Sequence, residues 1–220
     1  MLQPRGPRVH RQGARLAVVS ASQALARLVA GNERFVEGRA RFPTVKKEVL
    51  AALAKGQRPY ATIVGCSDSR VPPEILFDVG FGELFIVRVA GNIISTAVMG
   101  TLQYAAVHLH TQLFVILGHE GCGAVKAAIA RKYHGAVERR RIALLLDRIT
   151  PGLRGLPPGL NAEERLEAAV EANVRWSMRQ MRETPEGRAR MKEGVVKLVG
   201  AIVELKTGKV RFLPDSAGVS

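Results

Sequence analysis

Cys66 and Cys122 are the two cysteines of this 220-residue chain, and each lies in a short polar motif with glycine neighbours. The first motif reads Gly-Cys-Ser-Asp-Ser-Arg over residues 65–70, and the second reads Gly-His-Glu-Gly-Cys-Gly over residues 118–123. With His119 they offer two thiolates and one imidazole, which suit a tetrahedral Zn²⁺ site with Asp68 or a water as the fourth ligand. These residues therefore predict a zinc centre.

The number of ligands separates a catalytic zinc site from a structural one. Structural sites usually close with four Cys or His ligands, whereas here three are at hand and one position stays open. A redox dithiol would need a Cys-x-x-Cys motif, which the sequence lacks. The remaining alternative is a pair of unrelated free cysteines and a surface histidine, and the polar strand-end setting of all three residues argues against it.

Asp68 and Arg70 follow the first cysteine closely. If the chain is extended there, the two side chains point to the same side. An arginine can bind a carboxylate through two parallel hydrogen bonds, which would keep Asp68 ionised and away from the metal. Without that pairing, Asp68 could itself ligate zinc and close the site. A purely structural ion pair is the alternative.

The elements that must position these residues repeat three times along the chain. Apolar stretches typical of buried parallel strands end at a glycine-containing turn, and helical segments follow the turns. This pattern predicts an α/β fold with a mainly parallel central sheet flanked by helices. Ligands bind such sheets beyond the carboxyl ends of the strands, so the zinc should lie there. The predicted strands are residues 60–64, 84–89 and 112–117. The segments that follow them are a helical turn opening at 72–74, a helix over 95–109 and a helix that starts near 123.

The rest of the chain divides into helices, one loop and a hairpin. Ser20 and Gln23 form a capping-box pattern before the first apolar stripe, and Asn161 caps a late amphipathic helix. The predicted segments are helices over 20–37, 44–55 and 162–182, a loop over 151–160, and a hairpin of 195–199 with 210–213.

One zinc-binding catalytic domain over residues 19–214 accounts for these elements. It includes an N-terminal helical arm over about 20–55. A flexible basic tail over 1–18 precedes it, and a C-terminal tail over 215–220 follows.

The bulk composition narrows the class of partner. The formal charge is +14 but it is spread along the chain, aromatic residues make up 5%, and no nucleic-acid motif is present, so we expect no nucleic-acid partner. No apolar run approaches a membrane span of about 18–20 residues. Two separate cysteines favour a reducing compartment over a disulfide framework, so we expect a cytoplasmic protein, with a trimmed export signal as the alternative.

The motifs resemble those of the β-class carbonic anhydrases over about residues 22–213. Residues 66–71 and 118–123 are similar to the two zinc motifs of that family, and residues 88–92 are similar to its third conserved turn, from which Val89 departs. The resemblance implies one Zn²⁺ per chain on Cys66, His119 and Cys122, with Asp68 as a fourth ligand only in a closed state.

The resemblance also implies the reaction, which is the reversible hydration of CO₂ to bicarbonate and a proton by a zinc-bound hydroxide assisted by the Asp68–Arg70 pair. It implies self-association as a dimer or tetramer, with Tyr104 lent by the partner subunit. Tyr104 and His108 match a pair proposed as a proton relay. The positions that match substrate-binding residues are Gln57, Phe85, Ala90, Tyr104 and Gly123.

Two other functions stay open at this point. A relative on the same scaffold could hydrolyse CS₂ or COS, since the pocket mouth and the oligomer decide that choice. A non-catalytic zinc protein is the second alternative. The Asp68–Arg70 pair argues against it, because a structural zinc needs no such pair.

Overall fold

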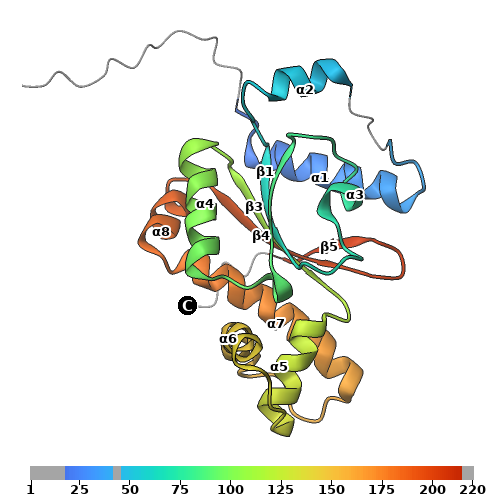
Figure 1. Cartoon of the computed structure of the whole chain (residues 1–220), viewed down its shortest axis with the longest axis vertical. Coiled ribbons are helices and arrows are strands. Elements are labelled where there is room, and N and C mark those ends of the chain that lie inside the picture. The colour runs from blue at the N-terminus through green and yellow to red at the C-terminus, as the bar shows by residue number, and fades with distance from the viewer. Residues whose placement is uncertain (1–17, 42–45, 215–220) are drawn as a thin grey trace, which may run out of the picture.

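A computed structural model describes residues 18–41 and 46–214 of the chain. Its centre is a five-stranded sheet of order β2-β1-β3-β4-β5, in which the first four strands are parallel and β5 is antiparallel to β4 (Figure 1). The predicted mainly parallel sheet is therefore confirmed. The strands are β1 (Ala61–Gly65), β2 (Leu84–Arg88), β3 (Leu113–His119), β4 (Lys197–Val203) and β5 (Val210–Phe212).

The central strands form because their sequences are almost wholly apolar. Every residue of β1 and of β3 is buried, as expected for parallel strands covered on both faces. β2 lies at one edge of the sheet and is only half-buried. The predicted zinc ligands lie at the buried ends of β1 and β3.

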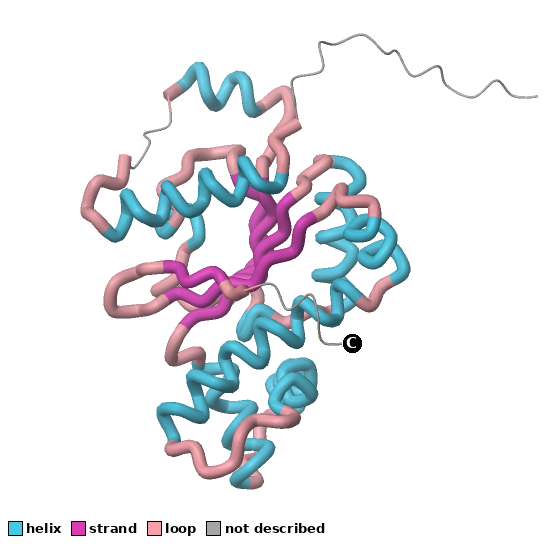
Figure 2. The backbone as a smooth tube through the Cα atoms, turned by 180° about the vertical axis from the view of Figure 1, so that it is seen from behind, coloured by secondary structure: helices cyan, strands magenta, loops and turns pink. Residues whose placement is uncertain are grey.

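Helices cover both faces of the sheet. Figure 1 shows α1 and α3 on one side of it and α4 and α8 on the other. The long α7 packs against β3 and β4, and Figure 2 shows it leading to a group of helices at one end of the molecule. The helices are α1 (Ala21–Val36), α2 (Lys47–Leu53), α3 (Pro73–Leu76), α4 (Thr96–His108), α5 (Gly123–His134), α6 (Arg140–Ile149), α7 (Ala162–Arg182) and α8 (Pro185–Lys192), with short 3₁₀ segments η1 (Ala90–Asn92) and η2 (Thr150–Leu153).

Local sequence signals placed the main helices correctly. The capping box of Ser20 with Gln23 begins α1, and a second box of Asn161 with Glu164 begins α7. The predicted hairpin is present, but its first arm was placed too early: residues 201–203 pair with 210–212, whereas residues 197–199 of the predicted arm 195–199 pair with β3. No helix of the described part of the chain is long and apolar enough to span a membrane.

Two helices, α6 and α8, were not predicted. The N-cap residue of α6 makes no capping hydrogen bond, so α6 carries no strong local start signal. α8 does carry one, since Thr184 caps it and Pro185 is its first residue, but none of its residues is buried and it lacks an apolar stripe. The segment 151–160, predicted as a loop, begins inside η2. Its proline and glycine content is compatible with a single 3₁₀ turn.

The outer boundaries of the chain stay predictions. Residues 1–17 of the expected N-terminal tail and all of the expected C-terminal tail lie outside the described residues, and so do positions 44 and 45 of the second predicted helix. The single domain over 19–214 is likewise a prediction.

Candidate metal centre

Three side chains from two neighbouring strands meet at the carboxyl end of the sheet. Cys66 follows β1 directly, His119 is the last residue of β3, and Cys122 is the N-cap residue of α5. The parallel register pairs Gly65 with Leu117, so β1 and β3 end side by side. The ligand atoms of the three residues all lie within 4.8 Å of one another, and all three residues are buried. This group could hold a metal ion.

The imidazole of His119 is oriented by its own neighbour. Its Nδ1 lies 2.8 Å from the carbonyl oxygen of Glu120, a contact that a protonated Nδ1 donates. Its Nε2 is buried and has no hydrogen-bond partner among the described residues. A histidine that binds a metal through one nitrogen commonly donates the other to a carbonyl or carboxylate. The unpaired Nε2 therefore fits a metal bond.

The thiols of Cys66 and Cys122 contact each other directly. A hydrogen bond from Cys122 lowers the pKa of the Cys66 thiol, while burial acts in the opposite direction. Both cysteines are free of disulfides. A metal ion binds the thiolate and deprotonates a coordinating thiol outright. Two sulfurs and one imidazole nitrogen are a donor set that fits zinc.

Asp68 and Arg70 form the predicted pair. Nε and one terminal nitrogen of Arg70 donate to the two carboxylate oxygens of Asp68 at 2.9 and 2.8 Å. These hydrogen bonds hold the pKa of Asp68 well below its usual range. The Asp68 carboxylate also lies beside the metal group, since its Oδ2 is 3.8 Å from His119 Nε2.

The backbone route to this pair differs from the expectation. Residues 68–71 form a turn rather than an extended segment, and the Arg70 amide donates to Asp68 Oδ1 at 3.0 Å. That contact spans two residues and is an Asx turn, in which the aspartate side chain organises its own backbone. The Asp68–Arg70 pairing that an extended chain would allow is therefore present, but it is made within a turn.

The turn after β2 supports the first cysteine. Arg88 Nε donates to the Cys66 carbonyl at 2.9 Å, and another nitrogen of Arg88 donates to the Asp68 carbonyl. The amide of Gly91 donates to the Cys66 sulfur at 3.3 Å. Ala90, predicted to bind substrate, opens this same turn. Ala90 is therefore the neighbour of Gly91, whose amide contacts the candidate ligand Cys66.

Gly123 is the first residue of α5, directly after Cys122. The first amides of a helix have no partner within the helix and carry its positive dipole end. The Gly123 amide can therefore donate a hydrogen bond to an anion near the metal group. A Cβ atom at this glycine would meet no atom within 4 Å, so the surroundings are open.

The other predicted substrate and relay residues lie elsewhere on the same chain. Phe85, Tyr104 and His108 form one aromatic cluster along β2 and α4, with ring centroids 6.2 Å apart for the first pair and 4.8 Å for the second. Gln57 is exposed in the segment before β1, at the opposite end of that strand from Cys66. A strand of this length spans roughly 16 Å. Within one chain, the fold does not bring Gln57 to the metal group.

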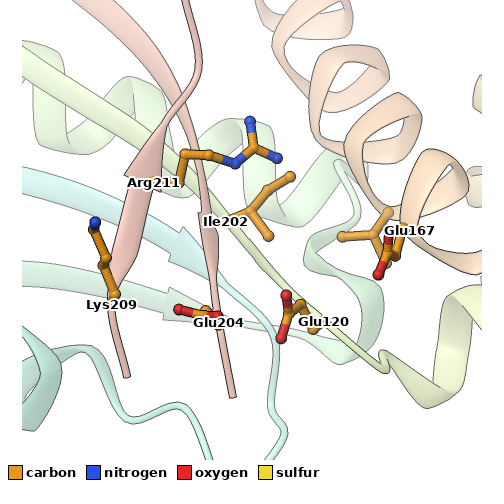
Figure 3. Close-up of a pocket in the computed structure, with 7 residues that line it drawn as sticks. Glu120, Glu167, Ile202, Glu204, Lys209 and Arg211 are labelled. Atoms are coloured by element: carbon orange, nitrogen blue, oxygen red, sulfur yellow. The ribbon is translucent and has the colours of Figure 1, made fainter. Parts of the chain in front are cut away.

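Glu120, inside the second motif, has a different role. Its carboxylate accepts a hydrogen bond from the Leu205 amide at 3.0 Å and so anchors the β4–β5 connection. It lines a cavity of about 360 Å³ together with Glu167, Glu204, Lys209 and Arg211 (Figure 3). Glu120 is not part of the metal-ligating group.

A buried Cys-His-Cys group at the strand ends of a mainly parallel sheet, with an Asp–Arg pair beside it, defines a zinc enzyme. Comparison with known proteins gives the family. The sequence model described as "Carbonic anhydrase" matches residues 61–210. The carbonic anhydrase of Mycolicibacterium smegmatis is 40% identical over 183 residues, which cover 83% of this chain and 88% of that protein.

Solved structures agree with the sequence comparison. The Coccomyxa β-carbonic anhydrase in complex with acetazolamide superposes with a TM-score of 0.69 at 26% identity, over 86% of each chain. A tetrameric β-carbonic anhydrase from Sordaria macrospora shares the fold with a TM-score of 0.67 at 21% identity, over 89% of this chain and 98% of that one. The chain belongs to the β-carbonic anhydrase family, whose cofactor is zinc.

Proposed function

We propose that this protein catalyses the reversible hydration of CO₂ to bicarbonate and a proton, with zinc held by Cys66, His119 and Cys122. The observation that carries the proposal is the Asp68–Arg70 pair, whose carboxylate lies 3.8 Å from the free nitrogen of His119. A structural zinc site does not need an ionised carboxylate beside an open coordination position. When bound, zinc supplies a Lewis acid that makes a nucleophile available near neutral pH.

The residues around the metal group position the reactants. Arg70 keeps Asp68 ionised and orients its carboxylate. The carboxylate can then accept a hydrogen bond from a proton-bearing group on the open side of the metal group. Fixing that group in one orientation lowers the entropic part of the barrier. The Gly123 amide, at the positive end of α5, is a donor for the anionic product.

The substrate pocket is completed by self-association in this proposal. Tyr104 and Val107 are 47% and 43% exposed on α4, which lies along the edge strand β2. Such large apolar side chains gathered beside a sheet edge favour a contact with a second copy. A dimer or tetramer would bring Gln57, Phe85 and Tyr104 of one protomer to the metal group of its partner.

The remaining assignments are also proposals. The adjacent, tilted rings of Tyr104 and His108 would provide a path for the proton leaving the site. We propose a reducing compartment, the cytoplasm, because both cysteines must stay available as thiolates.

The decisive experiment is stopped-flow CO₂ hydration from pH 6.5 to 9 on protein whose zinc content is measured in the same sample. We expect fast turnover at one zinc per chain, and strong loss of turnover without loss of zinc in Asp68→Asn. One zinc per chain with no CO₂ turnover at any pH would reject the proposal. CS₂ and COS would then be assayed, and inactivity on all three would indicate a non-catalytic zinc protein.

A further inference from the structure

Two buried polar side chains lie on the core-facing side of α7. Asn173 and Ser177 are 1% and 0% exposed, and the residues buried around them on α7 are mainly apolar. They are four residues apart, so they lie on the same face of the helix. Both donate to the turn after β2: Asn173 Nδ2 to the Gly91 carbonyl at 2.8 Å, and Ser177 Oγ to the Asn92 carbonyl at 3.1 Å.

The turn that they bind has an unfavourable backbone. Gly91 has φ 67° and ψ 21°, and Asn92, which carries a side chain, has φ 43°. Left-handed backbone is readily adopted by glycine but is disfavoured for residues with a Cβ, so Asn92 needs support from its surroundings. The peptide between them is held on both sides, since its carbonyl accepts from Asn173 and its N–H donates to the Val89 carbonyl at 2.9 Å.

The held residue, Gly91, is the one that contacts the candidate metal ligand. Its amide donates to the Cys66 sulfur at 3.3 Å. A Cβ atom at position 91 would lie 2.7 Å from Ile149 Cδ1 and 3.2 Å from Ala124 Cβ, so the turn is tightly enclosed. A hydrogen bond from a fixed backbone amide to a ligand atom orients that ligand, as outer-shell contacts commonly do in metal sites.

We propose that Asn173, assisted by Ser177, is a positioning residue of the zinc centre. It fixes the Gly91 turn so that the Gly91 amide holds the Cys66 sulfur toward His119 and Cys122. Neither side chain touches the metal group, and both act through the turn. The inference rests on the zinc site of the proposed function, but it concerns metal affinity rather than CO₂ chemistry.

The test compares three variants of the full chain, each loaded with zinc and with cobalt. Asn173→Leu removes the donor while keeping the branched shape and the number of side-chain heavy atoms, and Ser177→Ala removes only a hydroxyl. Met178→Ala is the control, because Met178 is a buried α7 residue beside Gly200 of β4, and its side chain has no donor that could bind the turn. Zinc affinity is measured by chelator competition, and the thiolate-to-cobalt absorption reports on the sulfur ligands.

We expect Asn173→Leu to weaken zinc binding by about 10- to 100-fold, the usual effect of losing an outer-shell partner, and to shift the cobalt absorption. Ser177→Ala should change both in the same direction by a smaller factor, and it decides the question if Asn173→Leu does not fold. Met178→Ala should lose stability but keep wild-type affinity and spectrum.

Wild-type zinc affinity and an unchanged cobalt spectrum in both Asn173→Leu and Ser177→Ala would overturn the inference, and so would an equal loss in Met178→Ala. The readouts do not depend on turnover. A wild-type protein that binds zinc but does not hydrate CO₂ would therefore defeat the proposed function while leaving this inference to be judged on its own results.

Discussion

Arg70 binds both carboxylate oxygens of Asp68, and it does so from a turn in which the Asp68 side chain also accepts the Arg70 amide. The carboxylate is thus held by three contacts from a single residue. Since Asp68 Oδ2 lies 3.8 Å from His119 Nε2, Arg70 controls a negative charge at the edge of the metal group. This relationship leads to the first prediction.

Arg70→Ala should lower kcat for CO₂ hydration by about 100-fold, because a misplaced reacting group costs that much when orientation is lost. Arg70→Lys should recover only part of it, since an ammonium cannot bind both oxygens in parallel. The matched control is Arg131→Ala, which breaks an exposed ion pair of 2.7 Å with Asp147 on α5 and α6. Stopped-flow rates at equal zinc content check the prediction, and it fails if Arg70→Ala and Arg131→Ala behave alike.

Zinc removal should lower the thermal stability of the fold. Zinc at 100 times its dissociation constant stabilises the native state by about 2.7 kcal/mol. In a chain of this size, that corresponds to a melting temperature about 5–10 °C higher than that of the metal-free protein. Calorimetry before and after chelation and zinc return measures the shift. In Cys122→Ser the zinc-dependent shift should be much smaller, and equal shifts in both proteins would contradict the ligand assignment.

Val107→Glu should prevent self-association, because it places a charge beside Tyr104 on the exposed face of α4. Burying an unpaired carboxylate in a subunit contact is strongly unfavourable. The control is Val137→Glu, at a residue that is 94% exposed between α5 and α6. Sedimentation analysis should give a smaller particle for Val107→Glu alone. An unchanged mass would locate the contact elsewhere.

Tyr60 should make the fold sensitive to alkaline pH. Burial, followed by the negative charge of Glu83, raises the pKa of Tyr60 above its ordinary value. The folded state therefore prefers the protonated phenol, and this preference is fully present below the unfolded pKa of about 10 and is lost as the pH rises beyond it.

Between pH 9 and pH 11, the wild type should lose about 1.4 kcal/mol more unfolding free energy than Tyr60→Phe, which has no phenol to ionise. Urea unfolding of both proteins at one protein concentration measures the difference. Parallel curves for the two proteins would show that the phenol ionises equally well in the folded and unfolded states.

The sequence by itself determined the main strands and the candidate ligands. β1 and β3 are continuous apolar runs, and glycine-containing turns follow them. The apolar pattern and the turn residues therefore predict where these strands end. Parallel strands share a carboxyl edge, so Cys66 and His119 were expected at the same edge, and the pairing of β1 with β3 made them neighbours. The caps of α1 and α7 are likewise local signals, because each is made by residues three positions apart.

Only the tertiary structure decided which polar residues support the centre. Asn173 and Ser177 lie 82 and 85 positions from the turn that they bind, and in the sequence they are two polar residues in an amphipathic helix. Gln57, by contrast, matched a family position, but the direction of β1 places it far from Cys66 in the same chain. Spacing along the chain reports contacts within one element, whereas contacts between elements depend on how the sheet and helices pack.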